Sequence, residues 1–348
     1  MTSFSPTNPY AKSHVDPKGA GDLRPTSVQI IHDEGLVNNM AGKVMFVTGS
    51  TSGIGVDTVK ALHLTGADIY MQARDLKKAE AVRDNILKTS EGRGKLEIVL
   101  MDLKSLKSVR EGARSFLEKW VLLFTVASTF NYPLTNVGVR NTPGTQTEDG
   151  FETQFGVNHL AHFLLFQLLQ PTLLASSTPS FNSRVINVTS GAHRGSKINF
   201  DNPNLEGIYN PRLAYSQSKT ANILMANQIE RLYGPLGVHG LSVHPGCIDT
   251  NLQKHDLRTQ EERDNYIRGR PVLQKVLKST AQGAATQVWA AVAKVWEGQG
   301  AVYLEECRKG HECEEPDMLN GGYKAYIFDK EAEEKSWEMS CQLVGANE

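Results

Sequence analysis

The sequence predicts an α/β protein with a single doubly wound parallel sheet and helices on both faces. Two observations predict this class: short apolar runs alternate with longer amphipathic segments along most of the chain, and the first run leads into a glycine-rich turn. At 348 residues the chain has room for one large domain or two. Because it shows neither an internal repeat nor a linker, we expect one domain over residues 23–348. Residues 1–22, rich in Ser, Pro, Asn, Gly and Lys, are expected to form a disordered or loosely attached arm.

The expected elements follow this alternation. The first strand is Lys43–Thr48, a continuous apolar run that is typical of a parallel strand with both faces covered, and a short helix within residues 25–37 precedes it. The later strands are expected at 67–72, 96–101, 184–188, 238–243 and, last, 301–304. The helices are expected at 55–64, 76–87, 106–118, 151–174 and 213–233. Repeated βα units of this kind build a parallel sheet through right-handed crossovers.

Composition and charge restrict the class of partner. Hydrophobic residues make up 40% of the chain and charged residues 22%, which is typical of a globular protein with a core. The formal net charge is −1, whereas binding to nucleic acid or to an anionic membrane ordinarily goes with a strongly basic balance or a run of Lys and Arg. We therefore expect a small-molecule partner. The sequence leaves the oligomeric state open, and a homo-oligomer is compatible with it.

The four cysteines indicate reduced thiols in the cytoplasm, because they are few and no secretory signal peptide precedes them. Cys307, His311 and Cys313 resemble part of a metal site, but a second pair at ligand spacing is missing, so we expect no metal. A membrane-spanning helix requires roughly 20 apolar residues. The most hydrophobic stretch, Val121–Phe130, is about half as long, and we expect no membrane anchor.

The turn after the first strand predicts a dinucleotide site. Gly49 allows a tight turn, Gly53 allows the backbone to approach a pyrophosphate, and Gly55 allows helix and strand to pack closely, with the helix N-terminus directed at the negative charge. This is the Rossmann-like arrangement. The expected cofactor contacts within the turn are Gly49, Ser52, Gly53, Ile54 and Gly55.

The end of the second strand favours NADP(H) over NAD(H). Arg74 follows this strand, where a basic residue would bind the extra phosphate, and Lys77 and Lys78 lie close by. Asp75 has the spacing of an acid that binds ribose, but it also precedes a helical segment and is well placed as its N-cap. Asp102, at the tip of the third strand, could contact adenine or cap the next helix.

Tyr215 and Lys219 lie four residues apart, which places them on one face of a helix. Hydride addition to a carbonyl leaves an alkoxide that needs a proton donor, and a tyrosine with a free pKa of about 10 needs a nearby cation to act near neutrality. The spacing alone proves little, so the order of the motifs carries the interpretation. In chain order these are the glycine turn, Asn158, Ser190, Tyr215, Lys219 and His244–Thr250.

Over about residues 40–310 this order strongly resembles the short-chain dehydrogenase/reductase family, in its large classical-type group. The resemblance implies that Tyr215 is the acid/base, that Lys219 lowers its pKa and holds the nicotinamide ribose, and that Ser190 hydrogen-bonds the substrate oxygen. It further implies that Asn158 maintains a proton relay. The Pro-Gly loop, with Ile248 and Thr250, would lie against the nicotinamide amide.

Two segments, Asn199–Asn204 and Tyr303–Cys307, look like the retinol-dehydrogenase-like branch, which includes many fungal proteins of specialised metabolism. We expect an NADP(H)-dependent enzyme that moves a hydride to or from a hydrophobic ketone or alcohol, for example a ketoreductase of specialised metabolism. A charged, helical substrate lid is expected at residues 251–278. The alternative function is a catalytically silent NADP-binding regulator.

The fourth strand departs from the family, in which this strand ends Asn-Asn-Ala-Gly. Thr135–Gly138 can be aligned with that motif and would bring Asn136 to the cofactor, but the strand would then contain Pro133, which a central strand tolerates poorly. Alternatively, Val121–Val126 forms the strand and an insertion follows. A third hypothesis is a mistranslated gene segment, such as a retained intron, that damages the fold.

Overall fold

The computed structural model describes residues 5–123, 129–135, 139–140, 142–248, 259–314 and 321–346. Its centre is an eight-stranded sheet with the order β10-β9-β6-β5-β4-β1-β2-β3, in which β10 is the antiparallel edge strand. The order reverses between β1 and β4, which is the doubly wound arrangement, and the predicted fold class is confirmed. The strands of this sheet are β1 Lys43–Val47, β2 Asp68–Ala73, β3 Leu96–Leu100, β4 Thr129–Thr135, β5 Ser183–Val188, β6 Val238–His244, β9 Val302–Glu305 and β10 Arg308–Lys309.

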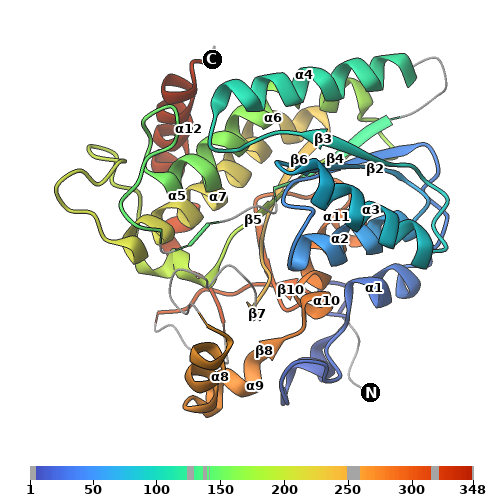
Figure 1. Ribbon diagram of the computed structural model, residues 1–348, viewed down its shortest axis with the longest axis horizontal. Helices are drawn as coiled ribbons and strands as arrows, with labels where there is room; N and C mark the ends of the chain where they lie inside the picture. Colours follow the sequence, from blue (N-terminus) through green and yellow to red (C-terminus); the bar gives the residue numbers. More distant parts are fainter. Residues whose placement is uncertain are drawn as a thin grey trace.

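Helices cover both faces of the sheet, as Figure 1 shows for α4 and α6 on one side and for α1 and α2 on the other. One face carries α4 Leu106–Leu123, α5 Thr153–Phe155, a π-helical turn Gly156–Leu160, α6 Ala161–Ser176, α7 Pro211–Tyr233 and α12 Lys330–Val344. The other face carries α1 Ser27–Asp33, α2 Ile54–Leu64, α3 Leu76–Thr89 and α11 Ala285–Val292. A second sheet pairs β7 Cys247–Ile248 with β8 Leu277–Lys278, near the short helices α8 Gln260–Arg268, α9 Pro271–Val276 and α10 Thr280–Gly283.

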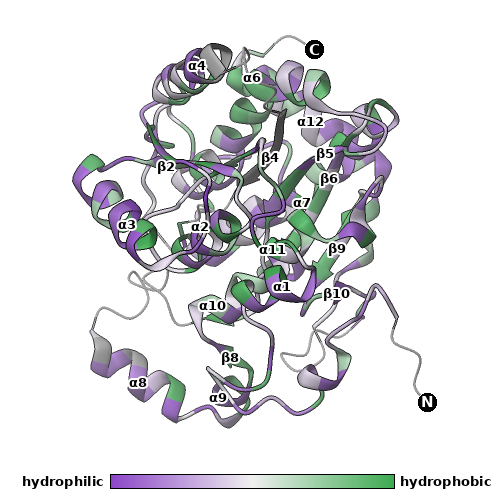
Figure 2. Ribbon diagram, turned by 90° about the vertical axis from the view of Figure 1, so that its right-hand side faces the viewer, coloured by the Kyte–Doolittle hydropathy of each residue, from purple (hydrophilic) through white to green (hydrophobic). Residues whose placement is uncertain are grey.

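The strand residues alternate between two apolar cores. In β1, Val44 and Phe46 pack with α4, α6 and α7, whereas Met45 and Val47 pack with α2 and α11, and all four are fully buried. This follows from the two-residue period of a strand, which directs successive side chains to opposite faces. Figure 2 shows the hydrophobic colour concentrated in β5, β6 and β9 inside the molecule. The sheet is therefore buried on both faces, and polar groups reach the surface at the strand ends.

The fourth strand follows the first of the alternatives that the sequence left open. β4 runs over Thr129–Thr135 between β1 and β5, and Pro133 pairs with Phe46. The pairing with β1 shifts register between Val44 and Met45, in keeping with a strand that lacks one amide donor. A strand at Val121–Val126 is wrong for residues 121–123, because α4 continues to Leu123; residues 124–128 lie outside the described residues.

The end of the chain also differs from expectation. The last predicted strand lies one residue later, at Val302–Glu305, and it is not the final one, because β10 turns back along it. Helix α12 was not predicted from the sequence; its Trp337 and Cys341 are buried against α6 and α7. Among the described residues, no helix combines the length and apolarity needed to cross a membrane.

The expectation of a loosely attached arm is wrong for the described part of residues 1–22. A 3-10 helix spans Ala11–His14, and the Tyr10 hydroxyl donates to Asp33 at 2.8 Å. The amide of Gly21 donates to the side chain of Gln282 at 2.9 Å. Polar residues therefore order this segment by hydrogen bonds to distant parts of the chain, which its lack of apolar periodicity could not indicate.

Candidate active site

A cavity of about 2010 Å³ opens at the carboxyl ends of the parallel strands. Its lining comes from the segments that follow β1, β2, β3, β5 and β6, on both sides of the point where the strand order reverses. In open α/β sheets this crevice is where ligands bind. The predicted site residues that line the cavity are Gly49, Ser52, Gly53, Ile54, Arg74, Lys78, Asp102, Ser190, Tyr215, Lys219 and Ile248.

Four predicted site residues do not appear in this lining, and two of the four cannot be placed. Gly55 is buried in the first turn of α2, which agrees with a packing role. Asn158 is fully buried behind the cavity wall. Asn136 and Thr250 lie outside the described residues, as do residues 251–258 of the predicted lid.

The turn after β1 presents backbone to the cavity. Gly49 and Gly53 adopt φ angles of 63° and 55°, a region that side chains other than glycine's rarely allow. Gly53 is the N-cap residue of α2, so the positive end of this helix adjoins the cavity. A buried glutamine that sequence reasoning missed fixes the turn: Gln72 accepts from the Gly49 amide at 2.9 Å and donates to the Met101 carbonyl at 2.6 Å. Its only sequence signal is a polar residue near the end of a buried strand.

The end of β2 places two cationic residues and one acid at the cavity. Arg74, Asp75 and Lys78 all line it and are exposed. The Asp75 side chain accepts from the Lys78 amide at 3.1 Å and caps α3, as one of its two predicted roles required. Asp102 accepts from the Lys104 amide at 3.0 Å, so it too has a local backbone partner while lining the cavity. Both acids thus have backbone partners, and Arg74 and Lys78 place two cationic side chains at this end of the cavity.

Tyr215 and Lys219 lie side by side in the first half of α7. The helix begins at Pro211 after an Asn210 cap, so Tyr215 and Lys219 are separated by one helical turn. Both are nearly inaccessible, with 6% and 3% of their surface exposed, although both line the cavity. The Lys219 Nζ atom lies 5.7 Å from the centre of the Tyr215 ring and donates to the Val188 carbonyl at 3.1 Å. The spacing in the sequence thus corresponds to contact in space.

The electrostatic setting of the pair is cationic. Burial raises the pKa of Tyr215, and the nearby Arg140 guanidinium and a hydrogen bond to Ser190 oppose this rise. Arg140 lies 5.9 Å from the Tyr215 ring centre. Burial lowers the pKa of Lys219 to about 8. The pKa of Lys219 therefore lies below that of Tyr215, which reverses the order of the two free side chains.

Ser190 lies just after strand β5 and lines the same cavity as Tyr215 and Lys219 of α7. Its hydroxyl accepts from the Ala192 amide at 3.2 Å in the turn that starts there. The hydroxyl can still donate, because it carries one hydrogen and two lone pairs. Ser190 and Tyr215 therefore present two hydroxyl donors to the same part of the cavity, an arrangement that suits an oxygen on which negative charge develops.

Asn158 connects the segment after β4 to α7. It lies in the π-helical turn Gly156–Leu160, and its side chain accepts from the Val139 amide at 2.7 Å and donates to the Val139 carbonyl at 2.9 Å. Its amide also donates to Ser218 Oγ at 3.0 Å, and Ser218 donates to the Tyr215 carbonyl at 2.8 Å. Short π-helical turns inside helices often occur at functional sites. The contacts make Asn158 a clamp beside the cavity, and its predicted part in a proton relay stays a prediction.

Arg140 and Arg194 are cavity residues that sequence reasoning missed. Arg140 follows the segment whose alignment was open, so nothing in the sequence connected it with Tyr215. Arg194 lines the cavity and donates to the carbonyls of Gly191 at 3.0 Å and Gly321 at 2.9 Å. The described residues contain no group of three or more His, Cys, Asp or Glu side chains placed to hold a metal ion.

The residues around the cavity fit a nicotinamide dinucleotide. The glycine turn and the start of α2 suit the pyrophosphate, and Arg74 and Lys78 suit a phosphate at the far end. The loop after β6 lines the opposite end with Pro245, Gly246 and Ile248. Beyond Tyr215 the wall includes the described part of the predicted lid and is mixed in character. Its apolar residues are Leu213, Ile267, Val272, Leu273 and Leu277, and its polar residues include Asn210, Arg212, Ser216 and Arg270.

Comparison with known proteins agrees with this geometry. A family model described as short chain dehydrogenase matches residues 43–261. Short-chain dehydrogenase/reductase prx1 of Penicillium roqueforti is 42% identical over 97% of this chain and 96% of that protein. Oxidoreductase calI of Penicillium decumbens is 41% identical, with 97% of each chain covered. Retinol dehydrogenase 11 of Homo sapiens is 33% identical over 88% of this chain and 87% of that protein.

Solved structures show the same fold. A crystal structure of an uncharacterised protein from Mycobacterium paratuberculosis is similar with a TM-score of 0.63 and 28% identity, covering 88% of this chain and 95% of that one. The RhlG/NADP active-site complex of Pseudomonas aeruginosa has a TM-score of 0.59 at 19% identity, covering 76% and 95%. The resemblance drawn from the order of the sequence motifs is confirmed.

Proposed function

Because the chain belongs to the short-chain dehydrogenase family, whose members are oxidoreductases of CH–OH and C=O groups, we propose that it is an NADP(H)-dependent reductase or dehydrogenase of hydrophobic ketones and alcohols. One observation carries the proposal: Tyr215 and Lys219 are buried one turn apart on α7, beside Ser190, where the cavity meets the strand ends. The bound nicotinamide would supply a hydride to the carbonyl carbon or accept one from the alcohol carbon.

In the reduction, Tyr215 is the proposed proton donor. Hydride arrival at carbon places negative charge on the substrate oxygen, which needs a proton and a hydrogen-bond donor at that moment. The Tyr215 hydroxyl gives the proton, and the Ser190 hydroxyl donates a hydrogen bond to the same oxygen. Lys219 and Arg140 stabilise the phenolate that remains, because each places a cation within about 6 Å of the ring.

Arg74 and Lys78 support the choice of NADP(H). Both line the cavity at the end of β2, where the ribose phosphate of NADPH would lie. We expect Arg74→Ala and Lys78→Ala each to weaken NADPH binding about tenfold and to leave NADH binding unchanged, since a charge-assisted contact to phosphate is lost. Lys77→Ala is the matched control, because Lys77 lies on the same turn and does not line the cavity. Equal affinity of the wild-type protein for NADH and NADPH would refute the choice.

The apolar residues of the far wall, Leu213 and those of the lid, support a hydrophobic substrate, and the identity to Penicillium relatives supports a ketoreductase of specialised metabolism. The four cysteines, all among the described residues, form no disulfide, which is in keeping with a cytoplasmic location. The central experiment measures NADPH binding by fluorescence and turnover of a panel of ketones, with Tyr215→Phe beside the wild type. We expect the variant to bind NADPH normally and to lose turnover. NADPH binding without turnover in the wild type, unchanged by Tyr215→Phe, would instead indicate a silent NADP-binding regulator.

A further inference from the structure

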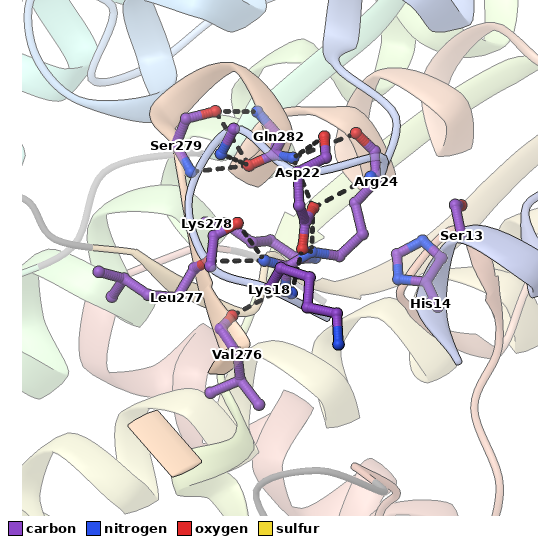
Figure 3. Close-up of polar contacts among 12 residues, drawn as sticks. Ser13, His14, Lys18, Asp22, Arg24, Val276, Leu277, Lys278, Ser279 and Gln282 are labelled. Atoms are coloured by element: carbon purple, nitrogen blue, oxygen red, sulfur yellow. Dashed lines mark hydrogen bonds and ion pairs between the residues drawn. The ribbon is translucent and has the colours of Figure 1, made fainter. Parts of the chain in front are cut away.

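The N-terminal segment lies against the second sheet, beside the cavity, and Arg24 makes the central contact (Figure 3). Only 3% of Arg24 is exposed. Its guanidinium donates to four backbone carbonyls: Gly19 at 3.1 Å, Lys275 at 3.5 Å, Val276 at 2.9 Å and Leu277 at 2.6 Å. Arg24 therefore joins the arm to the end of α9 and the start of β8, about 250 residues away in sequence.

The buried charge of Arg24 is balanced inside the arm. Its Nε atom lies 2.8 Å and 3.0 Å from the two carboxylate oxygens of Asp22. Burial raises the pKa of Asp22, but hydrogen bonds from Arg24 and from the Lys18 amide outweigh this effect and leave the pKa below its usual range. A buried guanidinium is tolerated when it is paired and hydrogen-bonded, and here Asp22 pairs it and each of its three nitrogens has an acceptor.

Gln282, which follows β8 in the chain, also binds the N-terminal segment. It is 1% exposed and belongs to the capping box of α10, and its side chain donates to Asp22 Oδ1 at 3.0 Å and to the Arg24 carbonyl at 3.2 Å. Its oxygen accepts from the Gly21 amide at 2.9 Å. The polar groups of the arm are thus shared with the elements just before and just after β8.

β8 in turn supports the loop after β6. It forms two residue pairs with β7, Cys247 with Leu277 and Ile248 with Lys278, and such a short ladder is weak by itself. The Lys278 ammonium donates to the Pro245 carbonyl at 3.3 Å and pairs with Glu306 at 2.9 Å. Cys247, Ile248 and Leu277 line the cavity, so any shift of β8 displaces that wall.

We propose that Arg24 is a positioning residue: it holds β8 in place and, through the β7–β8 pairing, fixes residues 245–248 at the end of the cavity beside Tyr215. The N-terminal arm is then part of the active-site structure, although it lies outside the segment matched by the family model. The kinetic consequence rests on the proposed function, whereas the structural coupling does not.

Amide hydrogen exchange tests the coupling directly. We expect Arg24→Met to speed exchange about tenfold in peptides that cover residues 245–248 and 276–278, with exchange at 43–64 unchanged, because these segments open locally once the arm is detached. Arg24→Lys should restore part of the protection, since one ammonium cannot reach all four carbonyls. Lys18→Ala is the matched control, because the Lys18 side chain is 67% exposed and contacts Asp16.

Unchanged exchange in both peptides, or an equal increase throughout the protein, would overturn the proposal and leave Arg24 with a general role in stability. If Arg24→Met does not fold, Asp22→Asn gives the same test, because it removes the carboxylate paired with Arg24. NADPH titration adds a second measure: Arg24→Met should raise the dissociation constant about fivefold relative to Lys18→Ala. A wild-type protein that binds no NADPH would refute the proposed function and leave the exchange result valid.

Discussion

The two sides of the cavity around Tyr215 are built differently. On one side, β5 and β6 share six residue pairs, and α7 packs along them with its buried residues running from Ala214 to Ile229. On the other side, β4 shares two residue pairs with β5 and shifts register against β1. The side with the proposed proton-transfer residues thus rests on long regular elements, and the side with Arg140 rests on a short irregular pairing.

The difference explains the contacts of Asn158. A side chain that spans the two sides is needed where the sheet itself pairs them weakly, and Asn158 binds both backbone groups of Val139 as well as Ser218 on α7. Mutations on the regular side should then mainly change the rate of the chemical step. Mutations on the irregular side should mainly change how the surrounding residues are positioned. The following predictions test this division.

The largest effect is expected for Tyr215→Phe. Loss of the hydroxyl removes the proton donor, and we expect kcat to fall about 10³-fold while NADPH affinity and unfolding temperature stay near wild type. Single-turnover kinetics with an excess of NADPH measure the chemical step. A variant that keeps a tenth or more of the wild-type rate would assign proton transfer to another group and would break the proposed division.

Lys219→Met should separate activity from stability. We expect activity to fall roughly 10²-fold, since the cation beside Tyr215 is lost. Burial lowers the pKa of Lys219 from 10.5 to about 8, so between these values the unfolded chain binds more protons than the folded one, and wild-type stability rises with pH. Below pH 8 the buried charge lowers the free energy of unfolding of the wild type by on the order of 3 kcal/mol. The variant avoids this cost but loses the hydrogen bond to Val188, so its net gain is smaller.

Denaturant unfolding at pH 7 and pH 10 measures the difference in stability between Lys219→Met and the wild type. Lys219→Met should be more stable than the wild type at pH 7, and its advantage should shrink toward pH 10. If the variant is less stable than the wild type at pH 7, the contacts of Lys219 stabilise the fold by more than the burial of its charge destabilises it. The regular side would then contribute to stability as well as to chemistry.

Asn158→Ala tests the connection between the two sides. It leaves the two Val139 backbone groups and the Ser218 hydroxyl without their partner, and we expect a loss of about 3 kcal/mol in the free energy of unfolding, together with lower kcat. Asn85→Ala, at an exposed position of α3, is the control and should change neither. Equal stabilities of the two variants would show that β4 is held in place without this clamp.

The sequence could predict the regular side closely. The order of β5, α7 and β6 follows from apolar periodicity, and the placement of Tyr215 and Lys219 on one helix face follows from their spacing, because local geometry decides both. The placement of Ser190 at the same cavity was implied by the family resemblance. The sequence also allowed a fourth strand that contains Pro133, but it could not decide between this strand and the alternatives. The energetic cost of a proline in a strand depends on the neighbouring strands, which are distant in the chain.

The arm and Arg140 mark where sequence reasoning ends. The arm was expected to be loose because it has no apolar pattern, yet Arg24, Asp22 and Gln282 order it through hydrogen bonds, which leave no periodic signal. Arg140 reaches Tyr215 only through the fold, across 75 residues of sequence. Polar contacts between distant segments are therefore the part of this site that required the structure.

The smallest effect is expected for Arg140→Met, and it tests whether the irregular side contributes to the chemistry at all. Arg140 opposes the rise in the pKa of Tyr215 that burial causes, so its removal should raise this pKa further. Oxidation of an alcohol requires the phenolate, and the rising limb of its pH–rate profile should move to higher pH. Arg140→Lys should restore most of the shift. Arg212→Met is the matched control, because Arg212 also lines the cavity and is exposed at the start of α7. If the rising limb does not move in Arg140→Met, or moves equally in Arg212→Met, Arg140 has no specific effect on the pKa of Tyr215. That pKa would then be set by residues on the α7 side alone.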